Sequence, residues 1–96
     1  MSKTNRSPSA ATAHLAGLLA PLDDNPVLLT TLRTFMHNHC NRRATASRLH
    51  IHPNSVDYRL RRVHQLTGLD PTEPDGTQRI AAALAARRIS EARRPR

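Results

Sequence analysis

The stretch NRRATASRLHIHPNSVDYRLRRVHQL, residues 41–66, decides how this 96-residue chain folds. Asn41 is a good helix N-cap, and residues 42–49 follow it as a short helix. Residues 50–52 form a turn in this interpretation. Pro53, a favourable first helical residue, then starts a longer basic helix. Two helices joined by a tight turn have the layout of a helix-turn-helix motif.

The apolar residues of this stretch predict which sides of its helices are buried. Val56, Leu60 and Val63 are separated by four and three positions, so they share one face of the second helix. Alanines in the first helix allow another helix to approach closely. The predicted core of the motif consists of Ala46, Leu49, Ile51, Val56, Leu60 and Val63.

The polar residues of the second helix fall opposite its apolar face. In a helix-turn-helix, the start of the second helix lies at the base edges in the DNA major groove. Asn bonds adenine, Arg bonds guanine, and both bond phosphate. We expect base-facing roles for Asn54, Ser55, Tyr58 and Arg59, and phosphate contacts for Arg42, Arg43, Arg48 and Arg62.

Two residues of this helix have alternative interpretations. Asp57 can accept from cytosine N4, but an ion pair with Arg61 one turn later is the favoured interpretation. Tyr58 can equally be a packing residue whose hydroxyl lies near a phosphate. For the whole segment, the competing interpretation is a solvated, arginine-coated helix in an ordinary bundle.

Composition favours a basic, all-helical protein. Hydrophobic residues make up 38% of the chain, with one Phe, one Tyr and no Trp, so the core depends on Leu, Ile, Val and Ala. We predict a small bundle of about five helices. The 14 Arg and one Lys outnumber the 7 acidic residues and give a net charge of +8. This charge indicates nucleic acid as the partner first, and an acidic membrane surface or protein second. A G+C-rich genome is a competing explanation for the Arg content.

The remaining helices are predicted from start and stop signals. Ser9 is the expected N-cap of a helix over residues 10–20 that Pro21 ends. Asn25 is the expected N-cap of a helix over residues 26–39, with Leu28, Leu32 and Phe35 as its apolar stripe. A final helix over residues 78–90 is expected after a loop at 70–76, with Thr77 as its cap.

These elements predict one domain. Residues 1–8 are interpreted as a flexible leader, residues 9–90 as the helix-turn-helix domain with its motif at 42–66, and residues 91–96 as a basic tail. The single Cys40 allows no internal disulfide, which fits a reducing cytoplasm. No apolar run approaches the roughly 20 residues that cross a bilayer, so we predict no membrane association.

Metal and catalytic sites are not expected. His37, His39, Cys40, His50 and His52 fit a tetrahedral zinc site poorly, because zinc commonly takes Cys pairs and residues two apart on a helix diverge. The acidic residues are few, and there is no Gly-rich phosphate loop. We predict no metal, no cofactor and no enzymatic activity.

The chain also resembles a known family. LLTTLRTFMHN and ATASRLHIHPNSVDYRLRRVHQLTGLD are similar to the C-terminal DNA-binding domain of PucR-type transcriptional regulators, and residues 58–70 are the most specific part. A wider resemblance is to Fis-like nucleoid proteins. The resemblance implies a helical domain that controls transcription. It also implies DNA-contact roles for Asn54, Ser55, Tyr58, Arg59 and Arg62.

Three residues depart from the pattern of that family. Pro53 stands where an Arg is common, and Asp57 stands where a basic or polar residue is common, so the family's base preference and affinity are not carried over to this chain. Cys40 stands where a Gly is usual, and we expect backbone strain there because Cys does not tolerate a left-handed conformation. The family's large sensor domains have no room here, so the chain is an excised domain or, as its leader slightly favours, a stand-alone regulator.

Taken together, the sequence predicts a cytoplasmic, nucleoid-associated and sequence-specific DNA-binding transcriptional regulator. It acts as a homodimer on double-stranded DNA, with the helix over residues 10–20 as the expected dimer contact, since its apolar face has no certain partner. The alternative is a nucleoid-type architectural protein with little sequence preference. A third interpretation is a protein-binding adaptor that has lost DNA binding.

Overall fold

The structure, a computed structural model, describes residues 8–92. In this range all of the regular secondary structure is helical, which confirms the predicted all-α fold. The elements are α1 (Pro8–Gly17), a 3-10 turn η1 (Ala20–Leu22), α2 (Pro26–His37), α3 (Arg42–Leu49), α4 (Pro53–Thr67) and α5 (Pro74–Ala92). Most of the predicted leader and tail lies outside the described residues, although Pro8 begins α1 and residues 91–92 end α5.

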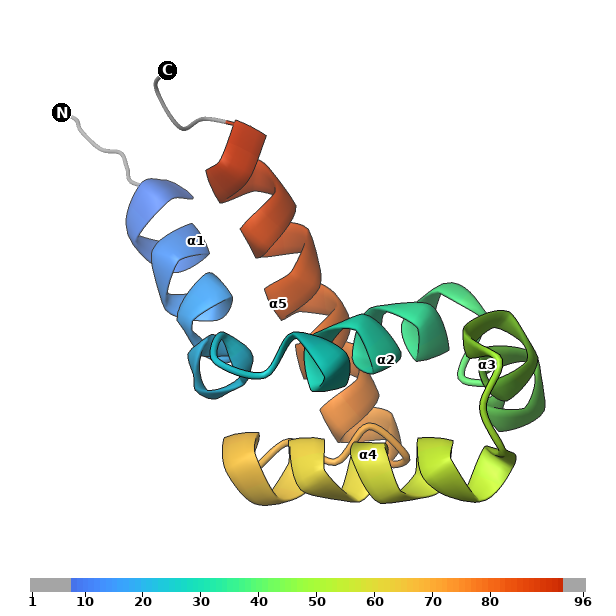
Figure 1. The fold of residues 1–96 in the computed structure, drawn as a ribbon. Coiled ribbons are helices and arrows are strands. Elements are labelled where there is room, and N and C mark those ends of the chain that lie inside the picture. Colours follow the sequence, from blue (N-terminus) through green and yellow to red (C-terminus); the bar gives the residue numbers. More distant parts are fainter. Residues whose placement is uncertain (1–7, 93–96) are drawn as a thin grey trace, which may run out of the picture.

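The helices form an elongated molecule with extents of 54 × 31 × 22 Å. Helices α1 and α5 lie side by side and run in opposite directions, while α2 and α4 cross the other end of the molecule with α3 beside them (Figure 1). This packing contradicts the premise of the expected dimer contact, because α1 has a partner within the molecule, namely α5.

The core is mostly aliphatic, with Phe35 as its one aromatic residue within residues 8–92, and it contains side chains from several elements. The predicted stripe of α2 is buried: Leu28 is 5% exposed, Leu32 0% and Phe35 4%. The core residues contributed by the other elements are Leu19, Leu22, Ala46, Val56, Leu60, Val63, Leu69, Ile80, Ala83 and Leu84. Helix α4 packs directly against η1, α2 and α3, so its position depends on elements outside the motif as well as on the motif.

Two asparagines start the helices as predicted. The side chain of Asn25 accepts a hydrogen bond from the Leu28 amide at 3.4 Å, and that of Asn41 accepts one from the Ala44 amide at 2.9 Å. Each bond satisfies an amide that the first helical turn leaves without a backbone partner. The start of α3, and with it the start of the motif, is fixed in this way.

The ends of the first and last helices differ from the prediction. Ser9 lies inside α1 and is not its N-cap, and α1 already ends at Gly17. Helix α5 begins at Pro74 instead of residue 78, because Pro suits the first helical turn. Thr77 is therefore not a cap; its hydroxyl donates to the carbonyls of Pro71 at 3.0 Å and of Glu73 at 2.9 Å.

The connection from α2 to α3 has a left-handed backbone. Helix α2 ends at His37, two residues earlier than predicted, and both His39 (φ 55°) and Cys40 (φ 60°) have positive φ. The expected strain at Cys40 is confirmed, since a side chain disfavours this region. The conformation lets the Cys40 amide donate to the Phe35 carbonyl at 2.9 Å, which closes the end of α2.

Candidate nucleic-acid interface

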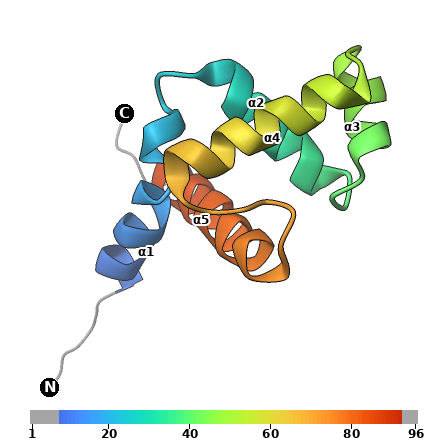
Figure 2. The same cartoon turned by 90° about the horizontal axis from the view of Figure 1, so that it is seen from below.

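Helix α4 has one buried face and one free face. Val56 and Val63 are 0% exposed and Leu60 is 3% exposed, which confirms the predicted inward side. Seen from below, α4 lies across the molecule with no other segment in front of it (Figure 2). By helical geometry, the side chains opposite the buried face are Asn54, Tyr58, Arg61, Arg62 and Gln65. We call these five residues the outer face of α4.

The outer face presents polar groups to solvent. Tyr58 is 57% exposed, so it is not the packing residue of the alternative interpretation. Arg62 Nη1 donates to Gln65 Oε1 at 2.7 Å, and this bond holds the guanidinium along the helix. The face therefore offers amide, phenol and guanidinium groups, which can bond base edges and phosphates.

Arg61 belongs to this face, although the sequence interpretation gave it to Asp57. Arg61 is exposed and makes no hydrogen bond or ion pair among residues 8–92. Its position two residues before Val63 and one after Leu60 already turns it away from the core. Helical geometry therefore predicts an outward position for Arg61, whereas the i, i+4 spacing to Asp57 predicts an ion pair that the structure does not contain.

Asp57 is paired with Arg42 of α3 instead of with Arg61. Arg42 Nε donates to Asp57 Oδ1 at 2.9 Å, and Arg42 Nη2 donates to Asp57 Oδ2 at 2.7 Å. This hydrogen bonding lowers the pKa of Asp57 and raises the pKa of Arg42. The expected pair within α4 is therefore wrong, and one of the predicted phosphate ligands is already engaged.

Arg59 lies at the edge of the predicted base-facing set. It is half-buried, and its Nη1 donates to the hydroxyl of Thr31 at 3.2 Å. Thr31 is itself fully buried on α2 and donates to the Val27 carbonyl at 2.8 Å. The guanidinium of Arg59 is thus held in a hollow beside the start of α2, next to Val27 and Thr30.

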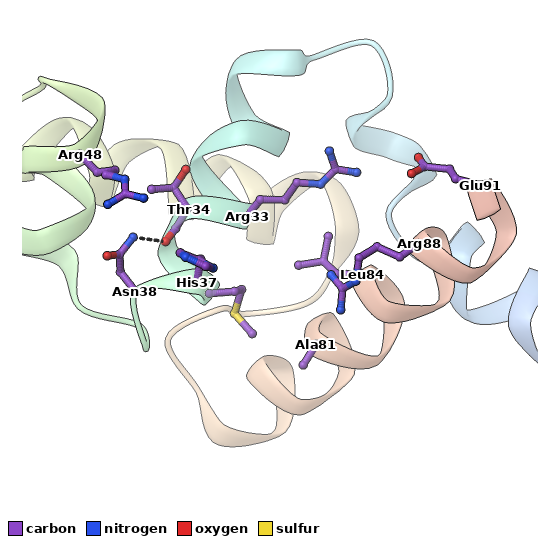
Figure 3. A pocket seen from close by; sticks show the side chains of 10 residues that line it. Arg33, Thr34, His37, Asn38, Arg48, Ala81, Leu84, Arg88 and Glu91 are labelled. Atoms are coloured by element: carbon purple, nitrogen blue, oxygen red, sulfur yellow. Dashed lines mark hydrogen bonds between the residues drawn. The ribbon is translucent and has the colours of Figure 1, made fainter.

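The arginines of α3 point to different sides. Arg42 and Arg43 line a shallow hollow between α3 and the start of α4, together with Ser47, His52 and Asn54. Arg48 lines another, larger groove over α2 and α5, where Arg33 and Arg88 also lie (Figure 3). Of the predicted phosphate ligands on α3, Arg48 is therefore separated from the other two.

The turn of the motif fixes the start of α4. His50 has a left-handed backbone (φ 58°) and ends α3, and the His52 Nδ1 accepts from the Asn54 amide at 3.0 Å. Ile51 packs against the core as predicted, whereas Leu49 is only half-buried and lies outside the core cluster. The inward role predicted for Leu49 is thus only partly correct. Ser55 is half-buried beside the outer face.

Two further properties concern the described residues as a group. Nowhere in residues 8–92 do three or more His, Cys, Asp or Glu side chains gather in a way that could hold a metal ion. None of the helices in that range is both long enough and apolar enough to span a bilayer.

Comparison with known proteins also identifies a helix-turn-helix domain in this chain. The PucR C-terminal helix-turn-helix domain family matches residues 28–86. The purine catabolism regulatory protein of Bacillus subtilis is 35% identical over 75 residues, which are 78% of this chain and 14% of that protein. The carbohydrate diacid regulator of Escherichia coli is 40% identical over 52 residues, or 54% of this chain and 14% of that protein.

A solved structure has the same fold. The regulator of polyketide synthase expression from Bifidobacterium adolescentis superposes with a TM-score of 0.78 at 27% identity, over 95% of this chain and 45% of that one. This chain thus spans less than half of the relatives it matches. It belongs to the PucR C-terminal helix-turn-helix domain family, whose members are DNA-binding domains of transcriptional regulators.

Proposed function

We propose that this chain is a sequence-specific DNA-binding module that regulates transcription by placing α4 in the major groove. The observation that carries the proposal is the two-sided character of α4: Val56, Leu60 and Val63 are buried, and the opposite face is polar and uncovered. The major groove is about 12 Å wide, so it admits an α-helix, and its base edges carry a donor and acceptor code that such side chains can read.

The base-reading roles are proposed for residues near the start and middle of α4. Asn54, Ser55 and Tyr58 keep the roles that the sequence suggested, and Arg61 joins them because it is exposed and unpaired within residues 8–92. Arg59 is proposed as a flanking contact, since its bond to Thr31 holds it toward α2. In this position its guanidinium is expected to lie closer to the DNA backbone at the edge of the groove than to a base.

Phosphate contacts are proposed for arginines beside this face. Arg43 lies at the exposed start of α3, and Arg62 lies along α4, so both can reach the backbone while α4 occupies the groove. Arg42 forms an ion pair with Asp57, so it is expected to contribute less to phosphate binding than Arg43 and Arg62. Arg48 lies in the groove over α2 and α5 and is not assigned to the same DNA segment.

We further propose that two copies act together on DNA in the cytoplasm, at the nucleoid, without catalytic activity. One helix-turn-helix reads only a few base pairs, and dimers of such domains bind half-sites about 34 Å apart. Sedimentation of the protein with duplexes that carry one or two half-sites tests this. A single copy on the two-site duplex at saturating protein would exclude the dimer.

The decisive experiment compares DNA sequences over a range of salt. A duplex selected from a random library is titrated beside a scrambled duplex of the same length. We expect the selected duplex to bind at least about 1,000-fold more tightly at physiological salt. Equal affinities with the same steep salt dependence would instead indicate the architectural role, and no binding at about 50 mM salt would indicate the adaptor.

A matched pair of arginine variants tests the face itself. Arg61→Ala removes a guanidinium from the outer face of α4, and Arg88→Ala removes one from exposed α5, with the same change in net charge. We expect Arg61→Ala to cost about 1–3 kcal/mol on the selected duplex and to relax its preference at one base pair. Arg88→Ala should change affinity by less than about threefold. Equal losses would reject the assigned face.

A further inference from the structure

A three-residue contact joins α3 to the outer face of α4. Arg42 donates through Nε and Nη2 to the two carboxylate oxygens of Asp57, at 2.9 and 2.7 Å. The same Nη2 donates to Asn54 Oδ1 at 3.4 Å. Asp57 and Asn54 are three positions apart and therefore neighbours on α4. The planar guanidinium thus engages a carboxylate and an amide oxygen together.

This contact is partly exposed, so its contribution to stability is small. The side chains of Arg42 and Asp57 are 41% and 36% exposed. Ion pairs in such positions contribute little to folding, because water and salt screen them. What the contact changes is the set of groups that the protein presents to DNA. The carboxylate of Asp57 compensates the positive charge of Arg42, and Arg42 occupies the side-chain oxygen of Asn54 on the outer face.

The occupied oxygen matters for reading adenine. An Asn side chain that recognises adenine accepts from N6 through Oδ1 while it donates to N7. Here a cationic donor already lies against Oδ1 of Asn54, so an adenine amino group would have to share that oxygen with it. The two N–H groups of Asn54 remain free of this contact. They match a base edge with two acceptors, and guanine offers such an edge through N7 and O6.

We propose that Asp57 determines specificity without touching a base: it holds Arg42 against Asn54, so that Asn54 reads guanine in preference to adenine and Arg42 is withheld from the phosphates. The inference rests on the proposed function, since it describes how the same face reads DNA. It also explains how an acidic residue is compatible with a DNA-reading helix. The carboxylate faces an arginine of the protein, and the pair presents little net charge to the duplex.

The test replaces Asp57 with Asn and uses Asp75→Asn as the control for net charge. Asp75 is an exposed carboxylate in the first turn of α5, outside the outer face of α4, and its substitution adds the same unit of charge. Affinity is measured on the selected duplex, on a guanine-to-adenine variant at each position, and on a scrambled duplex, over several salt concentrations. Circular dichroism verifies that each variant is folded.

We expect Asp57→Asn to release Arg42 for a phosphate. Affinity for all duplexes should rise by roughly threefold to tenfold at low salt, and the salt slope should steepen by about 0.9, the value for one added phosphate contact. Discrimination between guanine and adenine at one position should fall. Asp75→Asn should change affinity by less than about threefold and leave the slope and the discrimination as they were.

Two outcomes would overturn the proposal. If Asp57→Asn weakens binding at a single cytosine position and leaves the salt slope unchanged, Asp57 reads that base directly. If it behaves like Asp75→Asn, the contact has no role in recognition. Failure of the proposed function is a distinct result, because the unaltered protein would then not discriminate between the selected and scrambled duplexes at all.

Discussion

At the scale of single residues, the backbone conformation between α2 and α3 costs free energy that another residue would avoid. Cys40 has φ 60°, and its amide closes α2 by donating to the Phe35 carbonyl. A side chain makes this conformation unfavourable by roughly 1–2 kcal/mol relative to glycine. The same turn places Asn41 directly before α3, where its side chain caps the first helix of the motif.

Replacing Cys40 with Gly should therefore stabilise the protein. Part of the gain is offset by the greater freedom of glycine in the unfolded chain, and we expect a net increase of about 0.5–1 kcal/mol in the free energy of unfolding. In a domain of this size, 1 kcal/mol corresponds to a rise in Tm of about 4–8 °C. Cys40→Ala is the control, because it removes the thiol and keeps the Cβ. An equal rise for Ala would assign the effect to the thiol.

At the scale of elements, local signals predicted α2, α3 and α4 well and failed where contacts are distant in sequence. Asn25 and Asn41 set helix starts through bonds three residues away, so the sequence reveals them directly. The inward side of α4 follows from apolar spacing for the same reason. The pair of Arg42 with Asp57 spans 15 positions across a turn, and only the angle between α3 and α4 creates it.

The start of α5 shows a second kind of failure. Thr77 has the side chain of an N-cap, but Pro74 already begins the helix, and Gly76 in its first turn lies buried against the backbone of Asp70. A Cβ at Gly76 would lie 1.9 Å from the Asp70 carbonyl oxygen. Only glycine fits where the loop and the helix approach each other this closely. The residues around Gly76 do not reveal from the sequence alone that the backbone of Asp70 lies against it.

Gly76→Ala should accordingly destabilise the protein. The contact is with backbone atoms of the loop, which cannot move aside as a flexible side chain can, so we expect a loss of about 2–3 kcal/mol in the free energy of unfolding by urea. Gly17→Ala is the matched control: a Cβ there meets nothing within 4 Å, and φ is not positive. It should be neutral or stabilising by up to about 1 kcal/mol. Similar losses in both variants would contradict the proximity argument.

At the scale of the whole molecule, two carboxylates connect separate helical segments, and a third closes a local turn in the loop before α5. Asp23 accepts from Arg87 of α5 at 2.7 Å, Asp57 joins α4 to α3, and Asp70 accepts from the Thr72 amide at 2.9 Å in the loop before α5. Arg87 Nε also donates to the Ala16 carbonyl at the end of α1 at 3.1 Å. The bonds of Arg87 link α5 to α1 and to the segment after η1, and the bond of Asp57 links α4 to α3.

The same carboxylates predict how stability depends on pH. Hydrogen bonds from Arg87, Arg42 and Thr72 lower the pKa of Asp23, Asp57 and Asp70, respectively, below the ordinary value of 3.8. The folded protein therefore binds fewer protons than the unfolded chain at acidic pH. This contribution to stability is fully present above about pH 4, and it is lost as the pH falls through the lowered pKa values.

We therefore expect the urea midpoint of the protein to fall as the pH is lowered from 4 to 2. The triple variant Asp23→Asn, Asp57→Asn and Asp70→Asn cannot ionise at these positions, so it should be less stable than the unaltered protein at pH 6 and should lose a smaller part of its stability in acid. Each carboxylate is partly exposed, and added salt should weaken the effect by screening. A triple variant with the same acid dependence as the unaltered protein would show that other groups control it.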